Sequence, residues 1–248
     1  MTPVRFVLTL GLTLVSAQAQ ALGQTHALGQ PRAQQGYSRA AQRVLAQARA
    51  ASGGAAWGYL RGWHEAGRRD GAPYETWVDP LRYGLRTEIH ETAGVRVHGF
   101  NGLGAWQIAP SGVVSGTGDP AAVIPARGEA FFAANGFLFP GRFDARGDYL
   151  GRRRRQGRDF DVVSVKPWGG PARDLWFDSA THLLARAVTP GRPRPTTEEI
   201  SDYRRVGPLR VAFRFTLDDG AAGGARVRQL ERLDFAPADR SLFSLPRP

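Results

Sequence analysis

Apolar and polar residues alternate over several short stretches of the chain, which is the pattern of β-strands with one buried face. In residues 81–90 the odd positions are Leu, Tyr, Leu, Thr and Ile, and the even positions are polar or glycine. Residues 209–217 repeat the pattern, with an apolar residue at every odd position. Successive side chains of a strand point to opposite faces, so both stretches predict half-buried strands.

The stretch 172–190 predicts a β-hairpin. Two strand-like runs, 175–177 and 183–188, flank Asp178-Ser179-Ala180-Thr181, whose short polar side chains favour a turn by bonding their own backbone. Similar patterns predict further strands over residues 56–65, 74–79, 81–90, 95–100, 105–109, 113–117, 148–155, 160–166, 196–203, 209–217 and 225–235. Because several of these form hairpin-like pairs, we expect one large antiparallel sheet.

Two stretches predict helices. Ser38 can cap a helix that Gly53-Gly54 ends, and residues 121–134 form a second helix, which Pro125 could restart and Asn135-Gly136 ends. A helix inserted between strands buries its apolar side against the sheet, so we expect the second helix across the mouth or concave face. Residues 239–246 predict a terminal turn.

The N-terminus predicts export. Residues 1–21 combine an early charge, an apolar core from Phe6 to Val15 and small residues near position 20, which is the layout of a cleaved signal peptide. Residues 22–37 predict a flexible lead, and residues 38–248 a single domain. The chain has no cysteine, which excludes disulfides, thiolate metal sites and a lipid-modified cysteine. We therefore expect a periplasmic protein that is not a lipoprotein.

The composition is basic, with 33 Lys and Arg against 22 Asp and Glu and a formal net charge of +11. Almost all the cations are arginines, which pair well with phosphate and carboxylate. Export argues against nucleic acid as the partner. An anionic membrane surface, or simply a solubilising charge, explains the excess. The last predicted strand places Arg226, Arg228 and Arg232 on one face. The candidates for contact with an anionic partner are Arg152, Arg154, Arg226 and Arg228.

Short motifs follow one another along the chain in a recognisable order. They are Pro80-Leu81-Arg82-Tyr83, Gly99-Phe100-Asn101-Gly102 with Ala105-Trp106 and Pro110-Ser111-Gly112, Asp174-Leu175-Trp176-Phe177-Asp178 with Thr181, Asp202-Tyr203-Arg204, Gly207-Pro208-Leu209 with Phe213-Arg214, and Leu242-Phe243-Ser244-Leu245-Pro246. In this order they resemble the LolA/LolB/LppX-like superfamily of periplasmic proteins. The chain is also similar to the LolA-like module that precedes a retropepsin-type protease in some bacterial proteins, but no protease domain follows within these 248 residues.

The resemblance implies a mainly β (α+β) fold, a curved, unclosed antiparallel β-barrel with helices plugging its concave face. It also implies a hydrophobic cavity that carries the acyl chain of a lipid or lipidated cargo, without catalysis or cofactor, and we expect a monomer. The candidates for the cavity lining are Trp57, Tyr59, Trp63, Tyr83, Phe100, Trp106, Phe131, Phe132 and Trp176. The alternative is that these aromatic residues fill a solid core. The protein would then be a cell-envelope interaction or scaffold module with a basic face that binds an anionic partner.

Catalytic interpretations are weaker. Asp178-Ser179-Ala180 resembles the aspartate loop of aspartic proteases, but the glycine-bearing segment that follows in such proteases is missing and a turn explains the residues. His64, His90 and His98 could offer zinc three ligands, yet their spacing matches no ligand motif. Asp159 and Asp161 share a strand face, as a general acid and base might, and a solvated edge explains them better. We expect no catalytic residue and no metal.

Overall fold

The structure is a computed structural model that describes residues 36–139, 141–191 and 194–245, without the side chain of Thr117. The predicted signal peptide, 1–21, lies outside the described residues, as does the predicted flexible lead up to residue 35. Residues 34–248 form one compact unit. Neither α-helix in the described part of the chain has the length and apolar character that crossing a bilayer requires.

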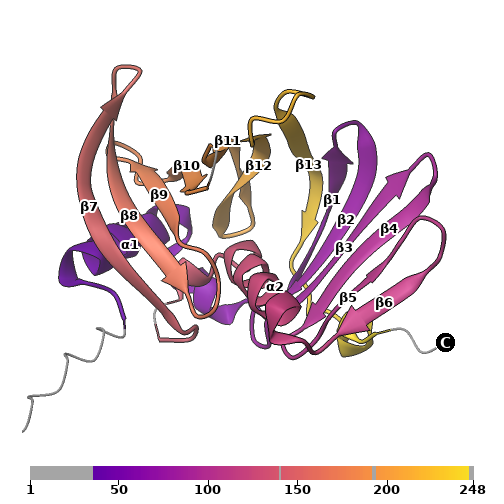
Figure 1. The fold of residues 1–248 in the computed structure, drawn as a ribbon. Coiled ribbons are helices and arrows are strands. Elements are labelled where there is room, and N and C mark those ends of the chain that lie inside the picture. The colour runs from indigo at the N-terminus through magenta and orange to yellow at the C-terminus, as the bar shows by residue number, and fades with distance from the viewer. Residues whose placement is uncertain (1–35, 140, 192–193, 246–248) are drawn as a thin grey trace, which may run out of the picture. The chain divides into compact units, whose positions relative to one another are not determined.

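One antiparallel sheet dominates the described residues (Figure 1). The first half of the chain supplies β1 (Trp63–Arg69), β2 (Ala72–Asp79), β3 (Gly84–Glu91), β4 (Gly94–Asn101), β5 (Ala105–Ile108) and β6 (Val114–Thr117). The second half supplies β7 (Ala145–Arg155), β8 (Arg158–Pro167), β9 (Arg173–Asp178), β10 (Leu184–Thr189), β11 (Thr196–Val206), β12 (Leu209–Asp218) and β13 (Arg226–Asp234).

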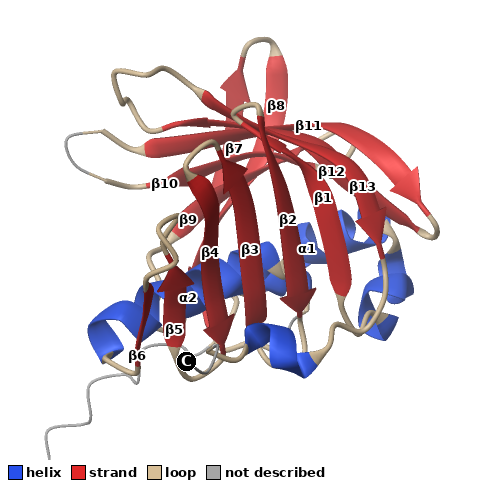
Figure 2. Ribbon diagram, turned by 90° about the vertical axis from the view of Figure 1, so that its right-hand side faces the viewer, coloured by secondary structure: helices blue, strands red, loops and turns tan. Residues whose placement is uncertain are grey.

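The two halves of the sheet are joined by the pairing of β1 with β13, the first and the last strand in the sequence. The strand order runs β6-β5-β4-β3-β2-β1-β13-β12-β11-β10-β9-β8-β7, so the edges are β6 and β7. The sheet curves strongly but its edges do not meet, and α2 (Pro120–Ala133), which connects them in sequence, lies on the concave side (Figures 1 and 2). The predicted curved, unclosed antiparallel barrel is therefore confirmed.

The two predicted helices are present. In α1 (Arg39–Ser52) the Ser38 Oγ accepts a hydrogen bond from the N–H of Ala41 at 3.4 Å, and the helix ends at Gly53. Gly53 has a φ of 136°, and a Cβ at this position would lie 2.4 Å from a methyl carbon of Leu209. Helix α2 is capped by Asp119 and continues through Pro125 without restarting there.

Two predicted strands begin later than expected. Residues 54–59 form a 3₁₀ helix, η1 (Gly54–Tyr59), and the strand starts only at Trp63. The reason is that the indole N–H of Trp57 donates to Ser52 Oγ at 2.9 Å, which folds the segment back on α1. Residues 81–83 form a turn, because the Asp79 carboxylate accepts the N–H of Leu81 at 2.8 Å and Tyr83 has a φ of 61°.

The prediction that Arg226, Arg228 and Arg232 share one face is wrong. The pairing register between β1 and β13 shifts between Ala66 and Gly67. Arg228 consequently lies opposite Arg69 on the concave side, whereas Arg232 lies opposite Ala66 on the convex side. A one-residue irregularity exchanges the faces of a strand.

The convex side is covered near β4–β6 by η3 (Arg240–Phe243). The indole N–H of Trp106 donates to the carbonyl of Phe243 at 2.9 Å, and a Cβ on Gly99 would lie 2.0 Å from the Trp106 ring. Glycine is therefore required at position 99, since a side chain would occupy the space of the indole. The predicted terminal turn is confirmed as this short helix.

Candidate ligand cavity

A cavity of about 770 Å³ lies on the concave side of the sheet, between the strands and the helices. This volume is within the range of roughly 300–1,000 Å³ that is usual for small-molecule sites. Its wall contains strands from both halves of the sheet together with residues of α1, η1, α2 and η2 (Gly136–Leu138).

The half of the cavity formed by β9–β12 is largely apolar. Its apolar strand residues are Leu175, Phe177, Leu184, Ala187, Ile200, Val211, Ala212 and Phe215. Arg173, Glu198, Tyr203 and Arg210 of the same strands also line the cavity. Phe132 from α2 and Phe137 and Leu138 from η2 complete the apolar surface. An apolar surface of this kind favours an apolar guest, because water at such a wall is released on binding.

The half formed by β1–β6 has polar residues at the middle of each strand. These are Glu65, Thr76, Thr87, His98, Gln107 and Ser115. Between them and the helices lies a second, apolar set on the same face, which includes Val78, Leu85, Phe100 and Ala105. The cavity is therefore amphipathic, and neighbouring polar side chains form a continuous set across the β1–β6 half.

Two ion pairs join charged side chains of the wall, whereas Arg69, Glu198 and Arg210 have none with a described residue. Arg228 donates to Glu65 at 2.9 Å and its guanidinium lies 3.7 Å from the centre of the Phe215 ring. Arg173 of β9 donates to Glu129 of α2 at 2.7 Å, which ties the helix to the sheet. Arg69, opposite Arg228, makes no ion pair with a described residue; desolvation and the charge of Arg228 lower the pKa of Arg69.

The nine predicted lining residues fall into separate groups. Trp57, Phe100 and Phe132 line the cavity. Trp106 borders it as well, with its indole on the convex side against η3. The other five do not line it: Tyr59 is 79% exposed, Trp63 and Phe131 are buried in the core, Tyr83 packs against Phe143, and Trp176 lies on the convex face beneath Arg186.

Sequence reasoning missed most of the apolar wall. Leu175 and Phe177 point into the cavity, and Trp176 between them points away. The prediction chose Trp176 and neither of its neighbours. The period of two in residues 175–177 was the available signal, since it separates Trp176 from its neighbours.

The four candidate cations for an anionic partner do not form one free patch. Arg152 pairs with Asp161 at 3.4 Å, Arg226 with Asp219, and Arg228 with Glu65 inside the cavity. Arg154 is exposed, and among the described residues it has no ion pair. Most of this charge is therefore already neutralised by the chain itself.

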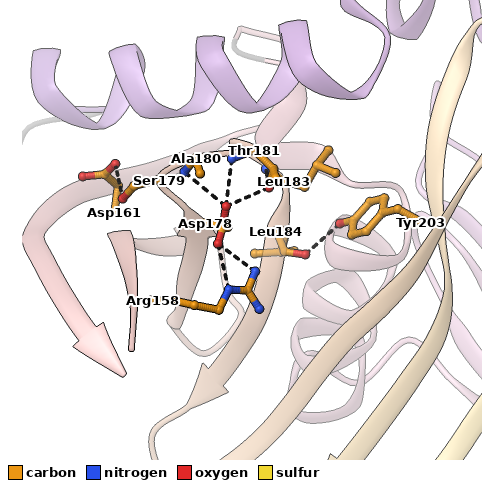
Figure 3. A network of polar contacts seen from close by, with 9 residues as sticks. All are labelled: Arg158, Asp161, Asp178, Ser179, Ala180, Thr181, Leu183, Leu184 and Tyr203. Carbon is orange, nitrogen blue, oxygen red and sulfur yellow. Dashed lines mark hydrogen bonds and ion pairs between the residues drawn. The ribbon is translucent and has the colours of Figure 1, made fainter. Parts of the chain in front are cut away.

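The Asp178 loop is a turn held by its own carboxylate (Figure 3). One oxygen accepts the N–H of Ala180 at 3.1 Å and both the N–H and the hydroxyl of Thr181 at 2.8 and 3.0 Å. The other oxygen accepts from Arg158 at 2.7 Å. Burial opposes ionisation, but these bonds outweigh it and hold the pKa of Asp178 below its usual value.

Asp161 is bound in a similar way. It accepts the hydroxyls of Tyr149 at 2.8 Å and Ser179 at 3.0 Å, in addition to Arg152. Burial opposes ionisation here too, and the hydrogen bonds from Tyr149, Arg152 and Ser179 lower the pKa of Asp161 overall. Both carboxylates thus hold hairpins together.

The three histidines are not brought together. His98 lies on the concave side among the cavity residues. His64 lies on the convex side, where its ring stacks on Trp77 with 4.6 Å between ring centres. Side chains on opposite faces of a sheet cannot coordinate one ion. In the described ranges no group of three potential ligands is suitably placed for a metal.

No protein-family model and no curated protein matches the chain. Solved structures do match. A LolA superfamily protein from Nitrosomonas europaea has a TM-score of 0.55 at 14% identity, covering 82% of this chain and 97% of that chain. A DUF1329 family protein from Desulfovibrio piger has a TM-score of 0.53 at 12% identity, covering 84% and 98%.

A putative outer membrane lipoprotein-sorting protein domain from Vibrio parahaemolyticus has a TM-score of 0.50 at 13% identity, covering 79% of this chain and 93% of that chain. At identities this low the likeness is one of fold. The order of motifs in the sequence indicated the same relationship. The chain has a LolA-like fold.

Proposed function

We propose that this protein is a periplasmic carrier or chaperone that binds the acyl portion of a lipid or lipidated cargo in its concave cavity, without catalysis. The observation that carries the proposal is the cavity of about 770 Å³ with an apolar half built by β9–β12. The LolA-like fold and the exported character of the sequence support it.

The energetics are sufficient for reversible binding. Burying acyl methylenes yields roughly 0.8 kcal/mol each, so a dozen contribute about 10 kcal/mol. Ordering the chain and losing its free motion cost several kcal/mol of that. The net affinity suits a carrier, which has to release its cargo, and it requires no polar chemistry at the apolar wall.

The structure offers explanations for the residues that suggested catalysis. Asp178 and Asp161 accept hydrogen bonds that close the β9–β10 and β7–β8 hairpins. Both carboxylates are ionised, and their oxygens already accept hydrogen bonds from other residues of the chain. The aspartates of a protease must share a proton and contact a water molecule. This supports a binding role.

The alternative of a scaffold with a filled core is less well supported. It requires the interior to be solid, and it requires a free basic face. The cavity and the pairing of Arg152, Arg226 and Arg228 with carboxylates both count against it.

Two neighbouring residues provide a matched test. Ile200 is 8% exposed and lines the cavity, while Ser201 on the same strand is exposed and does not line it. We expect lipid in organic extracts of gently purified wild-type protein by mass spectrometry. We also expect I200D to lose this lipid, together with binding of an N-phenyl-naphthylamine probe, and S201D to keep both.

The proposal fails if wild-type protein repeatedly carries no lipid and binds no apolar probe. It also fails if a folded I200D variant, checked by circular dichroism, binds as well as S201D.

A further inference from the structure

A row of six polar side chains crosses the concave face from β1 to β6. We call it the polar row: Glu65, Thr76, Thr87, His98, Gln107 and Ser115. Each member lies directly opposite the next in the sheet register. With strands about 4.8 Å apart, the row extends over about 24 Å.

The polar row is confined to one half of the cavity. On the helix side of it, the same strands present Val78, Leu85 and Phe100. Across the cavity, β9–β12 present Leu175, Ile200 and other apolar residues. A pocket for acyl chains alone would need no such row, because an acyl chain lying on it would take these groups out of water without giving them hydrogen bonds.

Half of the row is free to bind a guest. Glu65 accepts from Trp63 and Arg228, and the hydroxyls of Thr76 and Thr87 lie 3.0 Å apart in one hydrogen bond. His98, Gln107 and Ser115, the three members nearest the β6 edge, are exposed at the concave face and make no side-chain hydrogen bond to any described residue. Together they offer both donors and acceptors to the cavity.

The free members are also uncharged. The single carboxylate of the row, Glu65, is neutralised by Arg228. Desolvation and the charges of Arg96 and Arg69 lower the pKa of His98, which leaves its imidazole neutral at pH 7. A charged group placed on these three side chains would gain no counter-charge from them.

We propose that the polar row is a headgroup subsite, which takes the uncharged, hydroxyl-rich polar part of an amphiphile whose acyl part lies against β9–β12. The inference rests on the proposed carrier function and adds the class of cargo. The nearest competitor is an anionic headgroup bound by Arg69, which borders the same cavity without an ion pair to a described residue.

Three probes with the same dodecyl chain separate these possibilities: dodecyl maltoside, dodecyl sulfate and dodecyltrimethylammonium, each below its micelle-forming concentration. Affinities come from displacement of N-phenyl-naphthylamine. Two or three net hydrogen bonds of about 0.5–1.5 kcal/mol each predict that wild-type protein prefers the maltoside by about tenfold or more.

The variant Q107A/S115A should lower the maltoside affinity about tenfold and leave the two charged probes unchanged. H98A, on a strand inside the sheet, is the second variant and should also lower the affinity for the maltoside. S201A, a serine on the exposed side of β11, is the matched control and should bind all probes as the wild type does. Thermal unfolding shows whether each variant is folded.

The subsite is refuted if dodecyl sulfate binds best, which favours Arg69, or if both row variants retain full maltoside affinity. Failure of the carrier function itself looks different: neither N-phenyl-naphthylamine nor any dodecyl probe would bind the wild-type protein.

Discussion

Replacing Asp178 tests whether this carboxylate stabilises the fold. In D178A the N–H groups of Ala180 and Thr181 and the hydroxyl of Thr181 lose their acceptor. Bonds to a charged acceptor are worth about 1.5–3 kcal/mol each, and water partly replaces them in an open turn, so the expected loss of stability is about 2–4 kcal/mol. The ion pair with Arg158 adds little, because that side chain is 60% exposed.

The assay is urea unfolding followed by circular dichroism. We expect D178A to be less stable than D178N, which retains one oxygen acceptor, and R158A to lose no more than about 1 kcal/mol. A loss below about 1 kcal/mol for D178A, or an equal loss for R158A, would refute the account, because the backbone donors would then not depend on the carboxylate.

Three more predictions follow from buried groups. G99A should destabilise the protein by about 1–3 kcal/mol and shift its tryptophan fluorescence, since the new Cβ meets the Trp106 ring; an unchanged melting temperature would contradict this. F131A removes a fully buried ring and should lower the free energy of unfolding in urea by about 3–5 kcal/mol. A loss under about 1 kcal/mol would contradict this, because it would mean that neighbouring side chains fill the space of the ring. Because the pKa values of Asp178 and Asp161 are lowered in the fold, their ionised carboxylates stabilise it above about pH 4, and this stabilisation is lost as the pH falls further. A D161N/D178N variant whose urea midpoint falls as steeply with acid as that of the wild type would refute this prediction.

Turns and helix starts that depend on hydrogen bonds between neighbouring residues were predictable from the sequence. The β9–β10 hairpin follows from Asp178 and Thr181, whose side chains bond the backbone beside them. The caps Ser38 and Asp119 mark the starts of α1 and α2 for the same reason. These features depend on residues within a few positions of each other, which a sequence displays directly.

Features that depend on distant contacts were not predictable. Trp57 fits a strand pattern, but it lies in a 3₁₀ helix, where its ring packs edge to face on Phe139, a residue far away in the sequence. The register shift at Gly67 reverses the faces of Arg228 and Arg232 because β13 pairs with β1 from the other end of the chain. The polar row required the registers of six strands at once.

The chain order explains why the two halves of the cavity can differ in character. Strands β1–β6 and β7–β13 are consecutive meanders, and α2 lies between them in sequence. Each meander keeps its own alternation of side chains, so the polar row can cross β1–β6 while the concave face of β9–β12 is largely apolar.

Aromatic rings pack the core beside the helices. Phe143 meets Tyr83, Phe131 and Phe139 edge to face, with ring centres 4.8, 5.7 and 5.9 Å apart. Close-packed rings do not open readily, so under the proposed carrier function we expect a guest to enter from the opposite end of the strands, where Arg69 is exposed. The polar row lies between Arg69 and the apolar residues near the helices, so the proposal places the headgroup at the row and the acyl chain beyond it.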